Sequence, residues 1–133
     1  MSPTVQAVEV VQSAYAAFGR GDTPALLSLI ADDVEWKFIG AKGLPYTGTF
    51  RTRDEVANWF AGIPEVDDVL AFEPREFMPA GDNVTVLGWE RTQTRPSGEV
   101  FETEWAHVFT VRNGRIVRFW GIYDTEASAA ARG

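Results

Sequence analysis

The sequence predicts an α+β protein whose helices come first and pack on one face of a mainly antiparallel sheet. Two patterns carry this prediction. In residues 2–30 and 52–63, apolar positions recur at helical spacing behind capping signals. From Val69 onward, apolar and polar residues alternate in long segments separated by short turns, as in antiparallel strands. Helices followed by a run of strands are typical of α+β domains.

Two helices are expected near the N-terminus. Ser2-Pro3 places a capping serine before a proline at the first helical position, and Gly19 ends the helix. Its apolar positions follow helical spacing: Val5, Val8, Val11, Tyr15 and Phe18. Thr23-Pro24 starts a second, shorter helix, which Asp32-Asp33 ends.

The middle of the chain predicts a strand, a loop and a third helix. Residues 34–39 alternate as a half-buried strand does, and the glycine-rich residues 40–50 are expected to form a loop. Thr52 and Glu55 form a capping box, in which the threonine side chain accepts from the backbone of the glutamate. Pro64 is expected to stop the helix that follows.

Four strands are expected in the second half: residues 69–77, 84–95, 99–112 and 115–123. Pro74 indicates that the first of them is an edge or bulged strand. Asn113-Gly114 is a strong hairpin signal between the last two. The alanine-rich residues 126–133 are expected to form a short helix.

Length and charge limit the possible functions. A chain of 133 residues suits a single domain, residues 1–133. Its net charge of −7 disfavours nucleic acid and anionic membrane surfaces as partners, because phosphate binding needs clustered lysine and arginine. The N-terminal residues lack the features of a signal peptide, and no apolar run approaches membrane-spanning length, so a cytoplasmic protein is expected.

Cofactors and metals are not expected. The chain has no cysteine and one histidine, which makes a zinc site improbable. It also lacks a dinucleotide-binding glycine motif, a phosphate-binding loop and a nucleophilic serine elbow. Five tryptophans and nine phenylalanines indicate instead either a large aromatic core or a cavity lined by rings for an apolar molecule.

Three segments carry a family resemblance: YAAFGRGD (Tyr15 to Asp22), LIADDVEW (Leu29 to Trp36) and HVFTVRNGRIVRFWGIYDT (His107 to Thr125). With the order of elements, they resemble the ketosteroid-isomerase-like branch of the NTF2-like superfamily, especially its SnoaL-like polyketide cyclases. The resemblance implies a cone-shaped α+β barrel, with three N-terminal helices packed on a strongly curved, mainly antiparallel sheet. It also implies an apolar pocket and, in many members, a homodimer through the outer sheet face.

The resemblance does not extend to the catalytic residues of the steroid isomerases. Those enzymes use a carboxylate base on the first strand, and a tyrosine and a protonated aspartic acid that hold the enolate oxygen. Alignment places Phe38, Ala14 and Ala106 at these positions, with Tyr15 one residue along the helix. Steroid isomerase chemistry through the standard residues is therefore not expected.

Two candidate catalytic residues lie on the penultimate strand. Glu104 is two residues before Ala106 and so on the face that the resemblance assigns to the pocket, where a desolvated carboxyl would suit acid–base catalysis. Its alternative is an exposed or arginine-paired glutamate. His107 points to the opposite face of a regular strand, unless a bulge reverses it, and is otherwise a structural or interface histidine.

The third candidate catalytic residue is Asp124. It resembles, loosely, the acid–base aspartate that SnoaL-like cyclases place late in the chain, and it could equally cap the C-terminal helix. Aromatic residues are expected to divide between the core and a pocket wall. The candidates for ligand contact are Tyr15, Trp36, Phe38, Tyr46, Trp59, Trp89, Phe119 and Tyr123.

The sequence leaves two functions open. One is a cofactor-free enzyme, an isomerase, cyclase or related lyase or hydrolase, that acts on a small apolar carbonyl compound. Asp124 and Glu104 would transfer protons in it, and His107 would polarise a carbonyl or orient a carboxylate. The other is a non-catalytic module of the same fold that binds a hydrophobic ligand or a partner protein. An open pocket that combines a carboxyl group with His107 favours the enzyme.

Overall fold

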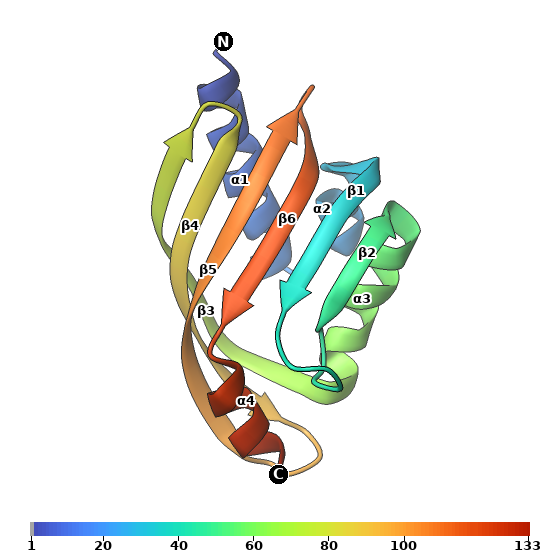
Figure 1. Ribbon diagram of the computed structural model, residues 1–133, viewed down its shortest axis with the longest axis vertical. Coiled ribbons are helices and arrows are strands. Elements are labelled where there is room, and N and C mark those ends of the chain that lie inside the picture. The colour runs from blue at the N-terminus through green and yellow to red at the C-terminus, as the bar shows by residue number, and fades with distance from the viewer. Residues whose placement is uncertain (1) are drawn as a thin grey trace.

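The computed structural model describes residues 2–133, and the predicted α+β arrangement is confirmed (Figure 1). The helices and strands follow one another as α1 (Pro3–Gly19), α2 (Thr23–Ser28), β1 (Ile30–Ile39), β2 (Gly48–Thr52), α3 (Arg53–Val66), β3 (Asp67–Ala80), β4 (Asn83–Thr94), β5 (Val100–Arg112), β6 (Arg115–Tyr123) and α4 (Thr125–Arg132).

The predicted helix starts are confirmed by their caps. The side chain of Ser2 accepts from the amide of Val5, and that of Thr52 accepts from the amide of Glu55. The Glu55 carboxylate reaches back to the amide of Arg51, one residue earlier than in a capping box. Pro64 lies inside the last turn of α3, which continues to Val66.

Two boundaries in the middle of the chain differ from the prediction. Strand β1 begins at Ile30, so Asp32 and Asp33 lie within it, as exposed residues. Residues 48–52, expected to be mostly loop, form the edge strand β2, paired with β1. The sequence does not reveal this short strand, because its residues are mostly polar and exposed and give no apolar alternation. An edge strand pairs with a neighbour on one side only, so it can form without apolar residues.

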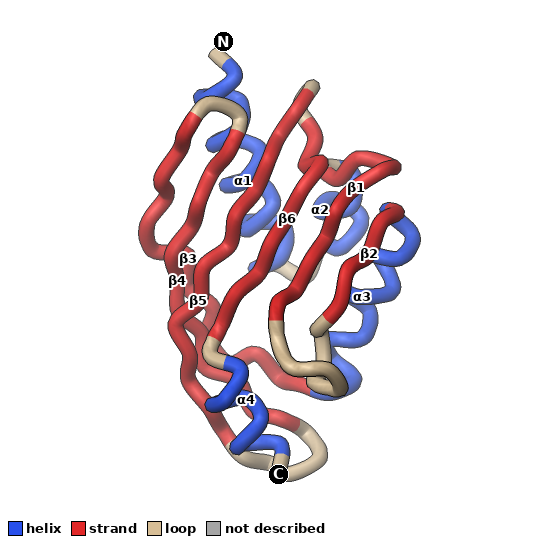
Figure 2. The backbone as a smooth tube through the Cα atoms, in the orientation of Figure 1, coloured by secondary structure: helices blue, strands red, loops and turns tan. Residues whose placement is uncertain are grey.

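The sheet has six strands in the order β2-β1-β6-β5-β4-β3. Strands β1 and β6 are parallel, and the other neighbours are antiparallel. Register shifts interrupt β3 after Val69 and after Pro74, and β3 is an edge strand, as Pro74 predicted. The sheet curves strongly, with α1, α2 and α3 on one face and α4 at the end where β3, β4 and β5 bend (Figure 2).

Two glycines let aromatic rings lie flat on the inner sheet face. A Cβ atom at Gly88 would lie 2.3 Å from the Trp105 ring, and one at Gly121 would lie 2.5 Å from Phe38. Any larger residue would displace these rings. The core therefore includes rings laid directly against the backbone of β4 and β6, and these rings position the side chains beside them.

Alternation along β5 settles which residues face the helices. Thr103, Trp105 and His107 are buried on the inner face, whereas Glu104 is exposed on the outer face. The strand is regular against β4 throughout this stretch, and no bulge reverses its side chains. The inner face of β5 thus carries the histidine, and the outer face carries the glutamate.

Candidate functional site

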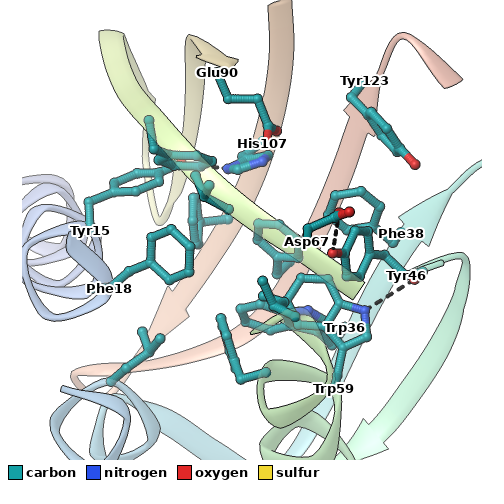
Figure 3. Close-up of a pocket in the computed structure, with 18 of the residues that line it drawn as sticks. Tyr15, Phe18, Trp36, Phe38, Tyr46, Trp59, Asp67, Glu90, His107 and Tyr123 are labelled. Carbon is teal, nitrogen blue, oxygen red and sulfur yellow. Dashed lines mark hydrogen bonds between the residues drawn. The ribbon is translucent and has the colours of Figure 1, made fainter. Parts of the chain in front are cut away.

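An aromatic cavity lies between the helices and the inner face of the sheet (Figure 3). Its volume is about 100 Å³, and most of its wall is apolar. Of the residues expected to contact a ligand, those that line it are Tyr15, Trp36, Phe38, Tyr46, Trp59, Phe119 and Tyr123. The rings come from α1, α3, β1, β6 and the loop before β2, so the cavity depends on the whole fold.

His107 lines this cavity and forms a hydrogen-bonded pair with Tyr15 of α1. The tyrosine hydroxyl lies 2.7 Å from Nδ1 of the imidazole. The Trp105 ring stacks on the imidazole at a centroid distance of 3.9 Å. Burial without a charged partner lowers the pKa of His107 to about 3, so the imidazole is neutral in neutral solution.

The pair has one arrangement of protons that satisfies both side chains. Burial raises the pKa of Tyr15, so its hydroxyl keeps its proton. Among residues 2–133, Nδ1 of His107 is the acceptor within reach of that hydroxyl. The tyrosine therefore donates to Nδ1, and the hydrogen of the neutral imidazole sits on Nε2. His107 thus offers an N–H donor on its side away from Tyr15.

Glu90 is a site residue that the sequence reading missed. It lies on β4, lines the cavity and points toward His107 in Figure 3. The Thr92 hydroxyl donates to its carboxylate at 2.6 Å. Burial is the main cause of a raised pKa for Glu90. The parity of β4 could have revealed it, because Glu90 lies an even number of residues after the core residues Val84 and Val86.

A second polar cluster adjoins the cavity through Asp67 and Tyr46, which line it. Asp67, at the start of β3, accepts two hydrogen bonds from Arg132 of α4, at 2.9 and 2.8 Å. The Tyr46 hydroxyl donates to the same carboxylate at 2.5 Å. Asp67 is only 2% exposed, because α4 covers it and Arg132 pairs its charge.

Tyr46 is held in a strained backbone conformation above the cavity. Its φ of 76° lies in the left-handed region, which costs a non-glycine residue about 1–3 kcal/mol. Its carbonyl accepts from Nε1 of Trp59 at 3.1 Å, while its hydroxyl is bound to Asp67. These contacts fix the loop that carries Tyr46 over the cavity.

The structure does not bring Glu104 and Asp124 to the cavity. The expected direction of Glu104 is wrong: it lies on the outer sheet face, because its parity is opposite to that of His107. Asp124 is exposed and caps α4, where its carboxylate accepts from the amide of Ala127 at 3.1 Å. The capping alternative for Asp124 therefore describes its position.

Trp89 also lies outside the cavity. It shares the outer face of β4 with the exposed Leu87, and the guanidinium of Arg75 lies 5.2 Å from its ring centre. Its expected ligand contact is therefore wrong. Trp36 and Tyr123, in contrast, are among the residues that line the cavity.

The described part of the chain has neither a cluster of metal-ligand side chains nor a membrane-spanning helix. Residues 2–133 contain no group of three or more histidine, aspartate or glutamate side chains that could hold a metal ion. None of the helices in this range is long and apolar enough to span a bilayer.

The chain belongs to the SnoaL-like domain family, whose model matches residues 11–119. An uncharacterized protein of Mycobacterium tuberculosis is 28% identical over 121 residues, which are 91% of each chain. An NTF2-like protein from Burkholderia thailandensis E264 is 33% identical, with a TM-score of 0.88 over 100% of this chain and 98% of that one. TerC, co-crystallized with polyporic acid, is 30% identical, with a TM-score of 0.79 over 95% and 97%.

More distant structures share the fold alone. A Bacillus subtilis protein provisionally named an isomerase is 17% identical, with a TM-score of 0.86 over 100% of this chain and 96% of its own. A Pseudomonas putida KT2440 protein provisionally named a polyketide cyclase is 18% identical, with a TM-score of 0.76 over 98% of both chains. At these identities the two structures share the fold with this chain, and their names do not assign it an activity.

Proposed function

We propose that the protein is an acid–base enzyme that activates the carbonyl group of a small, apolar molecule. The observation that carries this proposal is the neutral His107, whose Nδ1 accepts from Tyr15 at 2.7 Å inside an aromatic cavity. The reaction class is isomerisation, cyclisation or a related proton transfer next to the carbonyl. The side chains of the cavity supply the chemistry.

The Tyr15–His107 pair suits the stabilisation of an enolate. As a proton leaves the neighbouring carbon, negative charge develops on the carbonyl oxygen, and Nε2–H of His107 donates to it. Donation from Tyr15 to Nδ1 withdraws electron density from the ring and makes Nε2–H a better donor. Because the pKa of His107 is lowered to about 3, the ring donates as a neutral imidazole and holds no net charge of its own.

Two kinds of relative support a small-molecule occupant. TerC, at 30% identity, was crystallized with polyporic acid, which makes a small molecule a plausible occupant of the corresponding cavity here. The more distant relatives carry isomerase and cyclase names, which agree with proton-transfer chemistry.

A probe ketone tests the activity without knowledge of the natural substrate. 2-Tetralone is a small bicyclic ketone with exchangeable protons next to its carbonyl, and proton NMR in D₂O follows their replacement by deuterium. We expect the protein to accelerate this exchange, and His107→Phe to reduce the acceleration about 100-fold, as removal of an oxyanion donor does. Tyr15→Phe should reduce it less, because it only weakens that donor.

Val108→Ala is the matched control, because Val108 adjoins His107 on the same strand but faces the other side of the sheet. It should leave exchange unchanged. Equal exchange by the wild type and His107→Phe would contradict the proposal. Binding of 2-tetralone without any exchange would instead favour the non-catalytic module that binds a hydrophobic ligand.

A further inference from the structure

Glu90 faces the same cavity as His107, and we propose that its carboxyl group takes a proton from, and returns it to, the carbon next to the ligand's carbonyl. The inference rests on the proposed function, which needs a base as well as an oxyanion donor. It assigns a residue on β4, a strand that contributed no candidate to the sequence prediction for catalysis.

The sheet register sets the separation between Glu90 and His107. His107 pairs with Val86, and Glu90 lies four residues further along β4, opposite Thr103. Four residues of a strand span about 13 Å, and Gly88 and Trp105 hold the register position between the two. The Glu90 carboxyl group points toward His107 in Figure 3, and no hydrogen bond joins the two among residues 2–133. Both side chains line one cavity, which lets a single ligand contact both.

Asp67 also lines the cavity, but its carboxylate is already occupied. Both of its oxygens accept from Arg132, and one also accepts from Tyr46. Removing a proton from a ligand would require Asp67 to give up these bonds inside the protein. Among residues 2–133, Glu90 has one donor, the Thr92 hydroxyl on a single oxygen, which leaves its other oxygen able to accept a proton. Of these two carboxyl groups, Glu90 is the available base.

The surroundings of Glu90 raise its pKa above that of an exposed glutamate. Burial is the largest cause of its raised pKa, and the charge of Asp67 adds to it, whereas the Thr92 hydrogen bond and Arg132 oppose it. A carboxyl group with a raised pKa is a stronger base once it is ionised. The groups that face this region from the other elements are Tyr46, Asp67, His107, Tyr123 and Arg132.

The proton transfer balances without any added reagent. The ionised Glu90 accepts the proton, and the electron pair of the broken C–H bond becomes the carbon–carbon π bond of the enolate. The carbonyl π pair moves to the oxygen, where Nε2–H of His107 donates to it. Return of the proton from Glu90 to another carbon of the enolate gives an isomer, and exchange with D₂O before its return gives the deuterated ketone.

Two substitutions and one control test this role through the exchange of 2-tetralone. Glu90→Gln removes the base, and we expect a loss of at least about 100-fold. Thr92→Val keeps the shape of a buried residue but removes the hydrogen bond that favours the ionised form, so the rising limb of the pH–rate profile should move to higher pH. Glu102→Gln, on the exposed outer face of β5, should change neither quantity.

Binding of 2-naphthol gives a second readout that needs no turnover. This flat phenol resembles the enol of 2-tetralone, and its fluorescence reports binding. Glu90 is protonated when the enolate is present, so the wild type should bind 2-naphthol more tightly at acidic than at alkaline pH. Glu90→Gln imitates the protonated carboxyl group and should bind tightly at both pH values.

The two readouts separate the inference from the function on which it rests. Exchange that Glu90→Gln leaves unchanged would overturn the role of Glu90 and leave the carbonyl chemistry of His107 standing. No exchange by the wild type would contradict the proposed function. The pH dependence of 2-naphthol binding would then show whether Glu90 contacts the ligand. Binding with no pH dependence attributable to Glu90 would overturn its contact with the ligand, whereas dependence that Glu90→Gln removes would support that contact.

Discussion

At the scale of single residues, the fold imposes a charge state on His107. The ring lies among Tyr15, Trp105 and other aromatic side chains, and no carboxylate contacts it within residues 2–133. Desolvation therefore acts without compensation and disfavours the imidazolium ion. The same burial that makes the imidazole a neutral donor for a ligand should make the protein sensitive to acid.

The acid sensitivity can be measured by replacing His107 with Gln. Below pH 6.5 the unfolded chain binds a proton at this histidine, while the folded chain does so only near pH 3. The free energy of unfolding should therefore fall as pH is lowered from 6.5 toward 3, by up to about 1.4 kcal/mol per pH unit from this group. Urea unfolding between about pH 7 and pH 4 should show a shallower decline in His107→Gln. Parallel declines in both proteins would show that burial does not shift this pKa.

Whether a strand residue faces the helices or the outside depends on its odd or even position along the strand, and this decides which predictions of site residues hold. Seven of the eight rings named as candidates for ligand contact line the cavity. The sequence prediction misplaced Glu104, since aligning Ala106 with a pocket position set the parity of β5 wrong by one residue. Counted from the core residues of β4, the same rule would have found Glu90. Local alternation was therefore a better guide than the position of one aligned residue.

At the scale of elements, one buried ion pair holds α4 against the start of β3. The side chains of Arg132 and Asp67 are 13% and 2% exposed. Arg132 also donates to Ser128 and Thr94, so it joins α4 to the ends of β3 and β4. The sequence predicted the helix from its composition, but a partner 65 residues away is a tertiary contact that no local pattern contains.

Arg132→Met tests how strongly this contact holds α4. The substitution leaves Asp67 as an unpaired buried carboxylate, and we expect the free energy of unfolding to fall by about 3–5 kcal/mol. Adding Asp67→Asn removes the buried charge, so the double variant should recover part of the loss. Urea unfolding of the four proteins in the cycle gives the coupling energy. A double variant as unstable as the sum of both single variants would show that the pair contributes no coupling.

At the scale of the whole molecule, an apolar row crosses the sheet face opposite the helices. Leu87, Ala106, Ile122 and Ile39 are register neighbours on β4, β5, β6 and β1. Leu87, Ile122 and Ile39 are 39%, 43% and 37% exposed, which is high for large apolar residues on three strands of one sheet. Alternation predicts that every second residue of these strands faces outward, but which face stays uncovered depends on where the helices pack.

We propose that this row is where two copies of the chain associate, face to face, as the family resemblance leads one to expect. The small Ala106 lies between Leu87 and Ile122, so two such faces could approach closely at its position. Sedimentation of the wild type should give twice the chain mass of 14.7 kDa. Ile122→Glu places a charge in the row and should give a monomer, whereas Val5→Glu, at an exposed position on α1, should remain a dimer. A monomeric wild type, or a dimer that persists in Ile122→Glu, would contradict this assembly.

Unchanged binding of 2-naphthol by monomeric Ile122→Glu would show that each chain holds a complete cavity, because the row and the cavity lie on opposite faces of the sheet.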